Sequence, residues 1–259
     1  MAKKIIIGNW KMNPLSLKEA EKLFSSIAKS VSRIQKTEVV ICPPFIYLNQ
    51  LSKIRTSKIR LGAQNAFLIA DKGPYTGEIS AEMLYGIGAR YVILGHSERR
   101  ALGESNNDVN KKIKASLSAG LTPILCVGED VRDESHSYFN LVKTQVNECL
   151  NGISKDSLTK IIIAYEPIWS ISTTPNHKDA TPHDSEEMAL FIKKILVDKF
   201  GIKINMPRII YGGDVNEKNI YEFLKDGGVE GVLVGRVSLD AKKFSELIKI
   251  CEVLGKSKI

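Results

Sequence analysis

A strand-then-helix pattern repeats eight times along the 259 residues of this chain and constrains its fold more than any other feature. Short runs rich in Ile and Val recur at regular intervals, and continuous apolar runs of this kind are typical of parallel strands buried on both faces. They lie at Lys4–Trp10, Glu38–Cys42, Ile59–Asn65, Tyr91–Gly95, Thr122–Val127, Lys160–Tyr165, Arg208–Tyr211 and Gly231–Gly235. Each unit averages about 32 residues, the length of one βαβ step.

The segments between these runs have the periodicity of amphipathic helices. The clearest cases are 16–32, 107–119, 185–200 and 241–254. In the first, Leu17, Ala20, Phe24 and Ile27 recur at spacings of three and four residues and share one helix face. No linker rich in Pro, Gly or Ser divides the chain. We therefore predict one α/β domain over residues 1–259, a single eight-stranded parallel β/α barrel, with an open doubly wound sheet as the alternative.

The composition fits a globular protein rather than a disordered, fibrous or membrane-spanning one. Hydrophobic residues make up 43% of the chain and charged residues 25%, close to the average for soluble domains. No uncharged apolar run approaches the roughly 18 residues of a membrane helix. The apolar run Ile5–Ile7 near the N-terminus is too short for a signal peptide. The sequence therefore predicts a cytoplasmic protein that does not bind membranes.

The net charge of +8 favours an anionic partner. Lys and Arg form no long block or basic helical tail, so no nucleic-acid partner is expected, and a small phosphate ester fits the charge. The four cysteines contain no Cys-x-x-Cys pair, and the four histidines lack metal-ligand spacing. We expect free thiols, no metal and no cofactor.

Polar residues follow several strands, where a β/α barrel carries its functional side chains. Lys11 follows the first strand and brings a positive charge, unless it is an ordinary surface lysine. His96 follows the fourth strand with Glu98 two residues later, which is typical of an acid–base or electrophilic group, although a buried structural histidine is the alternative. Glu166 ends the sixth strand beside Trp169, where partial desolvation suits a base; an ion-paired structural Glu is the alternative.

Glycines after the last two strands predict an anion site. The stretches 212–214 and 235–238 let backbone N–H groups approach an anion, as in many phosphate-binding barrels, although two tight turns are the alternative. The polar segment 170–182 is a candidate lid or a loop insertion. A Lys, a His, a Glu and a phosphate site fit proton transfer next to the carbonyl of a small phosphate ester. Other phosphate-binding barrels, such as those of histidine and tryptophan biosynthesis, remain competitors.

The motifs at these positions resemble the triosephosphate isomerase family over the whole chain. Eight motifs occur in the order and spacing of that family. They are GNWKMN (8–13), GAQN (62–65), YTGE (75–78), LGHSERR (94–100), CVGE (126–129), AYEPIW (164–169), YGG (211–213) and LVG (233–235). The resemblance implies a TIM barrel without a cofactor. It also implies the interconversion of dihydroxyacetone phosphate and D-glyceraldehyde 3-phosphate through an enediolate, in glycolysis and gluconeogenesis.

The resemblance assigns roles to single residues. Glu166 matches the base that moves a proton between adjacent carbons, and His96 matches the imidazole that polarises the carbonyl. Lys11 matches the positive group that stabilises developing charge and anchors the substrate. Asn9 matches the neighbour that orients Lys11, and Glu98 matches the rim carboxylate that contacts Lys11.

The family is dimeric, with its third βα loop inserted into the active site of the neighbouring subunit. The matching segment here is Phe67–Glu78, with Thr76 as the inserted residue. Gln64, Glu78 and Arg99 match positions that support this interface. The resemblance therefore implies a homodimer.

Three departures from the family pattern fall on the expected phosphate site. The lid segment is longer, and Ser172 and Thr174 replace its glycines; Ser172 is expected to donate its backbone N–H to phosphate. Asp214 replaces a serine, and Arg236 replaces the glycine that follows Gly235. We expect Gly235, Arg236 and Asp214 to lie at the phosphate, with Arg236 either paired with Asp214 or pointing outward. Asp214 is also a candidate acceptor for N–H groups of the lid.

These departures keep two other functions open. The altered lid would admit an isomerase of a longer sugar phosphate, such as a tetrulose phosphate. A catalytically weak binding or interaction protein is the second alternative. The presence of Asn9, Lys11, His96 and Glu166 argues against it, because a binding protein needs none of them.

Overall fold

The computed structural model describes residues 3–171, 178–201 and 205–255. Within these residues, eight parallel strands pair in chain order and close into a barrel, because β1 (Lys4–Asn9) pairs with both β2 (Thr37–Cys42) and β8 (Gly231–Val234). The strands between them are β3 (Ile59–Ala63), β4 (Ala89–Leu94), β5 (Thr122–Val127), β6 (Ile162–Tyr165) and β7 (Arg208–Tyr211). The predicted barrel is confirmed, and the open doubly wound sheet is excluded.

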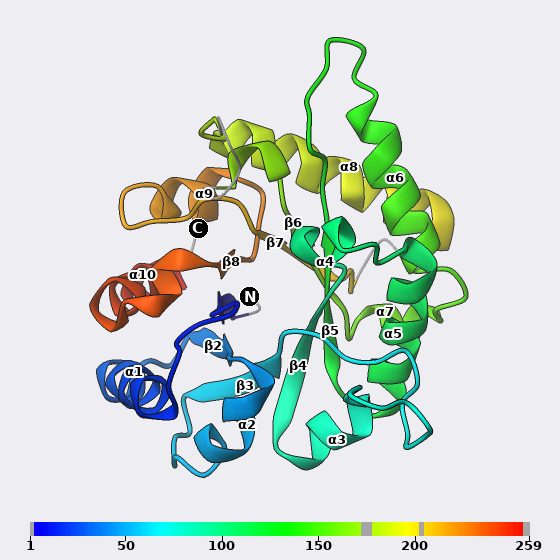
Figure 1. The fold of residues 1–259 in the computed structure, drawn as a ribbon. Coiled ribbons are helices and arrows are strands. Elements are labelled where there is room, and N and C mark those ends of the chain that lie inside the picture. The colour runs from blue at the N-terminus through cyan, green and yellow to red at the C-terminus, as the bar shows by residue number, and fades with distance from the viewer. Residues whose placement is uncertain (1–2, 172–177, 202–204, 256–259) are drawn as a thin grey trace.

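Helices surround the barrel on its outer side (Figure 1). The long ones are α1 (Leu17–Ser30), α5 (Asn106–Ser118), α6 (Tyr138–Cys149), α8 (Pro182–Phe200) and α10 (Ala241–Leu254). The short ones are α2 (Phe45–Leu51), α3 (Ala81–Gly86), α4 (Ser97–Ala101), α7 (Lys155–Leu158) and α9 (Ile220–Asp226), with 3-10 turns η1 (Ile168–Ser170) and η2 (Arg236–Leu239). In the described part of the chain, no helix has the length and apolarity to cross a membrane.

All four helices predicted from periodicity are present. The largest difference is at α8, which begins at Pro182 rather than at residue 185. The Thr181 side chain accepts a hydrogen bond from the Asp184 N–H, and the Asp184 side chain accepts one from the Thr181 N–H. Proline occupies the first turn of the helix. Such caps start a helix before its apolar periodicity begins, so the periodic pattern alone places the start too late.

Each strand divides its side chains between two apolar layers, because successive side chains point to opposite faces. In β1, Ile5 and Ile7 belong to the cluster inside the barrel. Ile6 belongs to the larger cluster, together with Phe24 and Ile27 of α1. Burial on both faces explains why the strands are continuous apolar runs in the sequence.

Three predicted strands extend one residue too far at the carboxyl rim. β1, β4 and β8 end before Trp10, Gly95 and Gly235. At Gly95 the φ angle is 68°, a left-handed conformation that interrupts a strand and favours glycine. The chain therefore turns directly after these strands and brings the following residues to the rim.

Candidate active site

The carboxyl ends of the strands enclose a pocket of about 210 Å³. Of the residues expected at the site, the structure brings seven together in its lining: Asn9, Lys11, His96, Glu166, Asp214, Gly235 and Arg236. Trp10, which sequence reasoning did not include, is fully buried and also lines the pocket. Ser172 lies outside the described residues, and Thr76 is an exposed residue of the loop before α3.

Lys11 is held in an uncommon backbone conformation. Its φ angle of 52° lies in the left-handed region, which residues with a Cβ adopt rarely and at a cost. The Lys11 N–H donates to Asn9 Oδ1 at 3.0 Å, and Gln64 Nε2 donates to the Lys11 carbonyl at 2.8 Å. Lys11 Nζ forms an ion pair with Glu98 Oε1 at 2.5 Å. These contacts fix the ammonium group at the mouth of the barrel.

His96 presents an N–H group to the pocket. Its Nδ1 accepts the backbone N–H of Glu98 at 3.2 Å, in the first turn of α4. A ring nitrogen that accepts a hydrogen bond carries no proton, so this network assigns the proton to Nε2. The Glu98 carboxylate is farther from Nδ1, at 3.7 Å, and does not replace that contact. His96 Nε2 lies 3.3 Å from Glu166 Oε1.

Glu166 is buried, with 2% of its surface exposed. Its Oε2 accepts the Ser97 N–H at 3.2 Å, and its own N–H donates to the Val127 carbonyl at 2.8 Å. Gly212 packs so closely that a Cβ there would lie 2.9 Å from Glu166 Cγ. The surrounding protein therefore limits the water that could exchange protons with this carboxylate.

Cys126 is a buried neighbour of Glu166 on β5. Burial raises the pKa of the Cys126 thiol well above its ordinary value, and the nearby Glu166 carboxylate raises it further. The thiol therefore stays protonated and contributes to the packing of the barrel interior.

The two charged residues at the expected phosphate end do not pair. Asp214 is half-buried after β7, and Arg236 is exposed after β8. Across residues 3–171, 178–201 and 205–255, no ion pair joins them; Asp214 Oδ2 instead lies 3.5 Å from Asn216 Nδ2. The expected pairing of Arg236 with Asp214 is therefore not formed in the described residues, and Arg236 is exposed.

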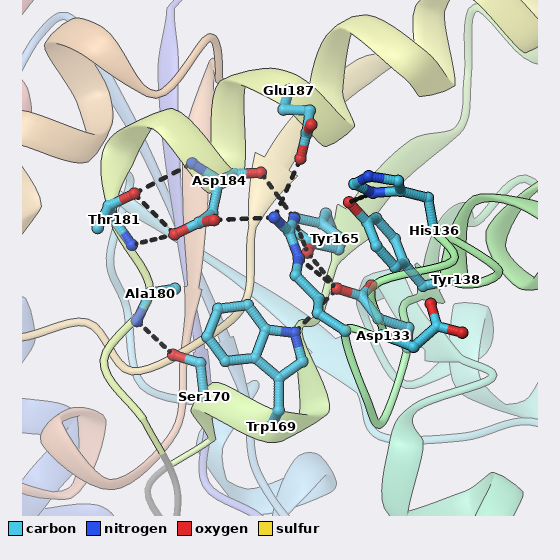
Figure 2. A network of polar contacts seen from close by, with 12 residues as sticks. Asp133, His136, Tyr138, Tyr165, Trp169, Ser170, Ala180, Thr181, Asp184 and Glu187 are labelled. Atoms are coloured by element: carbon cyan, nitrogen blue, oxygen red, sulfur yellow. Dashed lines mark hydrogen bonds and ion pairs between the residues drawn. The ribbon is translucent and has the colours of Figure 1, made fainter.

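A second polar network supports the chain on both sides of Glu166, at Tyr165 and at Trp169 (Figure 2). Its centre is Glu129, which is fully buried after β5. Glu129 Oε1 accepts from Tyr165 OH at 2.8 Å, Trp169 Nε1 at 2.9 Å and Arg132 Nε at 3.2 Å. Burial raises the pKa of the Tyr165 hydroxyl, and the Glu129 carboxylate raises it further, so the hydroxyl remains a donor. Sequence reasoning missed this network, although the motif CVGE locates Glu129.

The described ends of the segment after Glu166 are also held together. The Lys178 N–H donates to the Trp169 carbonyl at 3.0 Å. The Ala180 N–H donates to Ser170 Oγ at 3.1 Å (Figure 2). The chain then enters α8 through the Thr181 cap. The backbone before residue 172 and the backbone after residue 177 are therefore hydrogen-bonded to each other.

Known proteins share this fold over nearly the whole chain. The triosephosphate isomerase family model matches residues 4–251. The triosephosphate isomerase of Dehalococcoides mccartyi strain CBDB1 is 46% identical over 254 residues, which cover 96% of this chain and 97% of the relative. That of Caldanaerobacter subterraneus subsp. tengcongensis is 44% identical over 253 residues, covering 96% and 99%. The crystal structure of triosephosphate isomerase from Bartonella henselae has a TM-score of 0.82 at 35% identity and covers 96% of this chain and 98% of its own. The chain belongs to the triosephosphate isomerase family of aldose–ketose isomerases.

Proposed function

We propose that this protein interconverts dihydroxyacetone phosphate and D-glyceraldehyde 3-phosphate in glycolysis and gluconeogenesis. The observation that carries the proposal is the buried Glu166 carboxylate 3.3 Å from His96 Nε2, in one pocket with Lys11. This set contains a base, a neutral donor and a fixed positive charge, which an enediolate mechanism requires.

In the proposed reaction, Glu166 removes a proton from the carbon next to the carbonyl. The electrons of that C–H bond form a carbon–carbon double bond, and the π electrons of the carbonyl move to its oxygen, which accepts a hydrogen bond from His96 Nε2 and faces the Lys11 ammonium. The substrate oxygen takes the place that Glu166 Oε1 occupies beside His96 in this structure. His96 Nε2 gives its proton to this oxygen and takes one from the neighbouring hydroxyl, and Glu166 returns the carbon-bound proton to the former carbonyl carbon. Hydroxyl and carbonyl have then exchanged places.

We propose that the phosphate lies between the loops after β7 and β8. Gly235 and Arg236 would supply backbone N–H groups there, and Ser172 would supply another from the lid. Asp214, which replaces a serine of the family pattern, would repel a neighbouring phosphate. Two like unit charges at about 4 Å repel by roughly 4 kcal/mol at an effective dielectric of 20. The Asp214 carboxylate must therefore face Asn216, as in this structure, rather than the phosphate.

The preference of the enzyme between a three-carbon and a four-carbon sugar phosphate tests this function. We expect kcat/KM for glyceraldehyde 3-phosphate to exceed that for a four-carbon ketose phosphate by at least about tenfold, because the extra CHOH unit must fit into the same pocket of about 210 Å³. Steady-state assays with both compounds measure this ratio. A reversed preference would establish the longer-sugar isomerase. Negligible turnover of both by folded protein would establish the binding protein.

We also propose a homodimer. Large apolar side chains are exposed on three neighbouring segments: Met12 and Leu15 after β1, Ile46 on α2 and Leu102 after α4. Tyr47 OH of α2 bonds to the Pro14 carbonyl at 2.9 Å, and Glu98 of α4 pairs with Lys11, so these segments adjoin one another. Exposed apolar patches of this kind mark interfaces. The exposed Thr76 would then enter the pocket of the partner subunit.

Charges placed in this patch should dissociate the dimer. We expect the double variant Leu15→Asp, Leu102→Asp to sediment as a monomer and to lose turnover, since two buried carboxylates at an interface are strongly unfavourable. Val253→Asp is the matched control, because Val253 is 59% exposed on α10. Analytical ultracentrifugation gives the readout. A parent protein that sediments as a monomer, or a double variant that stays dimeric, would contradict the proposal.

Two further parts of the proposal concern location and domain organisation. We propose a cytoplasmic protein, supported by four buried free cysteines, as is typical of a reducing compartment. We propose one domain over residues 1–259, supported by the pairing of β1 with β8, which ties the two ends of the described chain into one core.

A further inference from the structure

Arg132, in the loop between β5 and α6, connects the chain before Glu166 with the helix that follows the lid segment. Its Nη2 donates to Tyr165 OH at 3.1 Å, and its Nε contacts Glu129 Oε1 at 3.2 Å. On the other side its Nη1 contacts Asp184 Oδ1 at 2.8 Å and Glu187 Oε2 at 3.0 Å. Figure 2 shows Tyr165, Asp184 and Glu187 converging on this point. One guanidinium group thus joins β6 to α8.

The same guanidinium also lies over two aromatic rings. Its central carbon lies 5.0 Å from the centre of the Tyr138 ring and 5.4 Å from the centre of the Trp169 ring. Cation–π contacts at these distances are attractive, and arginine favours them because its charge is delocalised over a plane. Arg132 is therefore restrained by ring contacts as well as by hydrogen bonds.

The ion pair with Glu129 also holds Arg132 in place. The Glu129 side chain has no exposed surface, and Arg132 is the cation that forms an ion pair with it. A buried carboxylate that loses its cation is strongly unfavourable. Glu129 Oε1 also accepts hydrogen bonds from Tyr165 and Trp169. A displacement of Arg132 that moves Glu129 would therefore move both of these side chains.

We propose that Arg132 is a positioning residue for the isomerisation, an inference that rests on the proposed function. Tyr165 directly precedes Glu166, and Trp169 follows it by three residues. Arg132 contacts the first directly and the second through Glu129 and its ring face. It thereby fixes the backbone on both sides of the base, so that the carboxylate meets the reacting carbon.

Lysine cannot reproduce this arrangement. A single ammonium group would keep the ion pair with Glu129, but it lacks the planar fork that reaches Glu129, Tyr165 and Asp184 at the same time. Arg132→Lys should therefore retain the charge and lose part of the positioning. A purely electrostatic role would instead be restored fully by lysine.

The test compares Arg132→Met and Arg132→Lys with the parent protein. We expect kcat per folded protein to fall about 10- to 100-fold in Arg132→Met, because a misplacement of about 1 Å can cost on the order of 10²-fold. The KM for glyceraldehyde 3-phosphate should change less than about threefold, because the residue does not touch substrate. The isotope effect with deuterium at carbon 2 should be at least that of the parent, since proton removal becomes slower relative to other steps. Arg132→Lys should recover only part of kcat.

The matched control is Arg208→Met, which breaks the 2.8 Å ion pair of Arg208 with Glu38 at the amino-terminal end of the barrel. It should lower stability and leave kcat per folded protein unchanged. A kcat for Arg132→Met or Arg132→Lys within about twofold of the parent would overturn the inference. If Arg132→Met does not fold, the double variant Glu129→Gln, Arg132→Met removes the buried charge as well and is judged by the same criterion. A parent protein without turnover would overturn the proposed function, and this inference with it.

Discussion

Replacing Glu166 with Gln is expected to lower kcat for glyceraldehyde 3-phosphate by about 10²- to 10⁴-fold, the usual contribution of a general base. Glutamine has the same shape, and its amide oxygen can still accept the Ser97 N–H that now contacts Glu166 Oε2. The amide nitrogen cannot take a proton from carbon. Because Glu166 is 2% exposed, bulk water has poor access to the reacting carbon and cannot take over its role. The KM should change little, since the phosphate contacts remain.

A coupled steady-state assay that follows dihydroxyacetone phosphate measures this loss. The matched control is Glu21→Gln, which removes an exposed carboxylate on α1 and should leave kcat unchanged. Exchange of the carbon 2 proton with solvent deuterium should fall in parallel with kcat, because both require removal of that proton. A Glu166→Gln variant that keeps more than about a tenth of the parental kcat would assign the base to another residue.

The fold could be predicted almost completely, because burial on both faces leaves a strong local signal. A strand inside the barrel wall, such as Thr122–Val127, must be apolar at nearly every position, and no distant contact is needed to recognise it. The convergence of Lys11, His96 and Glu166 follows from the same logic, since parallel strands bring their carboxyl ends to one rim.

Contacts between side chains that lie far apart in the sequence leave no such signal. Arg132 and Asp184 are 52 residues apart, and neither periodicity nor strand order indicates that their side chains meet. Arg236 and Asp214 show the converse: their charges are complementary in the sequence, which leaves open whether they pair, but Arg236, at the start of η2, is exposed and forms no ion pair with Asp214 in the described residues. Whether two such side chains pair depends on the conformation of both segments that carry them.

Gly128→Ala is expected to destabilise the fold and to remove most of the activity, because the added methyl group would occupy the position of the Glu166 backbone. A Cβ on Gly128 would lie 1.8 Å from the Glu166 carbonyl oxygen and 2.6 Å from its carbonyl carbon. These are main-chain atoms, so no rotamer change relieves the overlap. Gly128 itself cannot retreat freely, since Gln145 bonds to both its N–H, at 2.8 Å, and its carbonyl, at 3.0 Å.

The clash must therefore be relieved at Glu166, at the cost of its 2.8 Å hydrogen bond to the Val127 carbonyl. Overpacking in a close-packed interior costs about 1–3 kcal/mol or more, and a shift of about 1 Å in the base costs on the order of 10²-fold in rate. Gly86→Ala is the matched control: Gly86 ends α3, and a Cβ there meets no atom within 4 Å. It should leave the free energy of unfolding within about 1 kcal/mol of the parent. Chemical denaturation and kcat, measured on both variants, separate the two effects. Lost stability with a parental kcat in Gly128→Ala would mean that β5 moves and Glu166 stays, so that the position of the base is not set by contact with the Gly128 backbone.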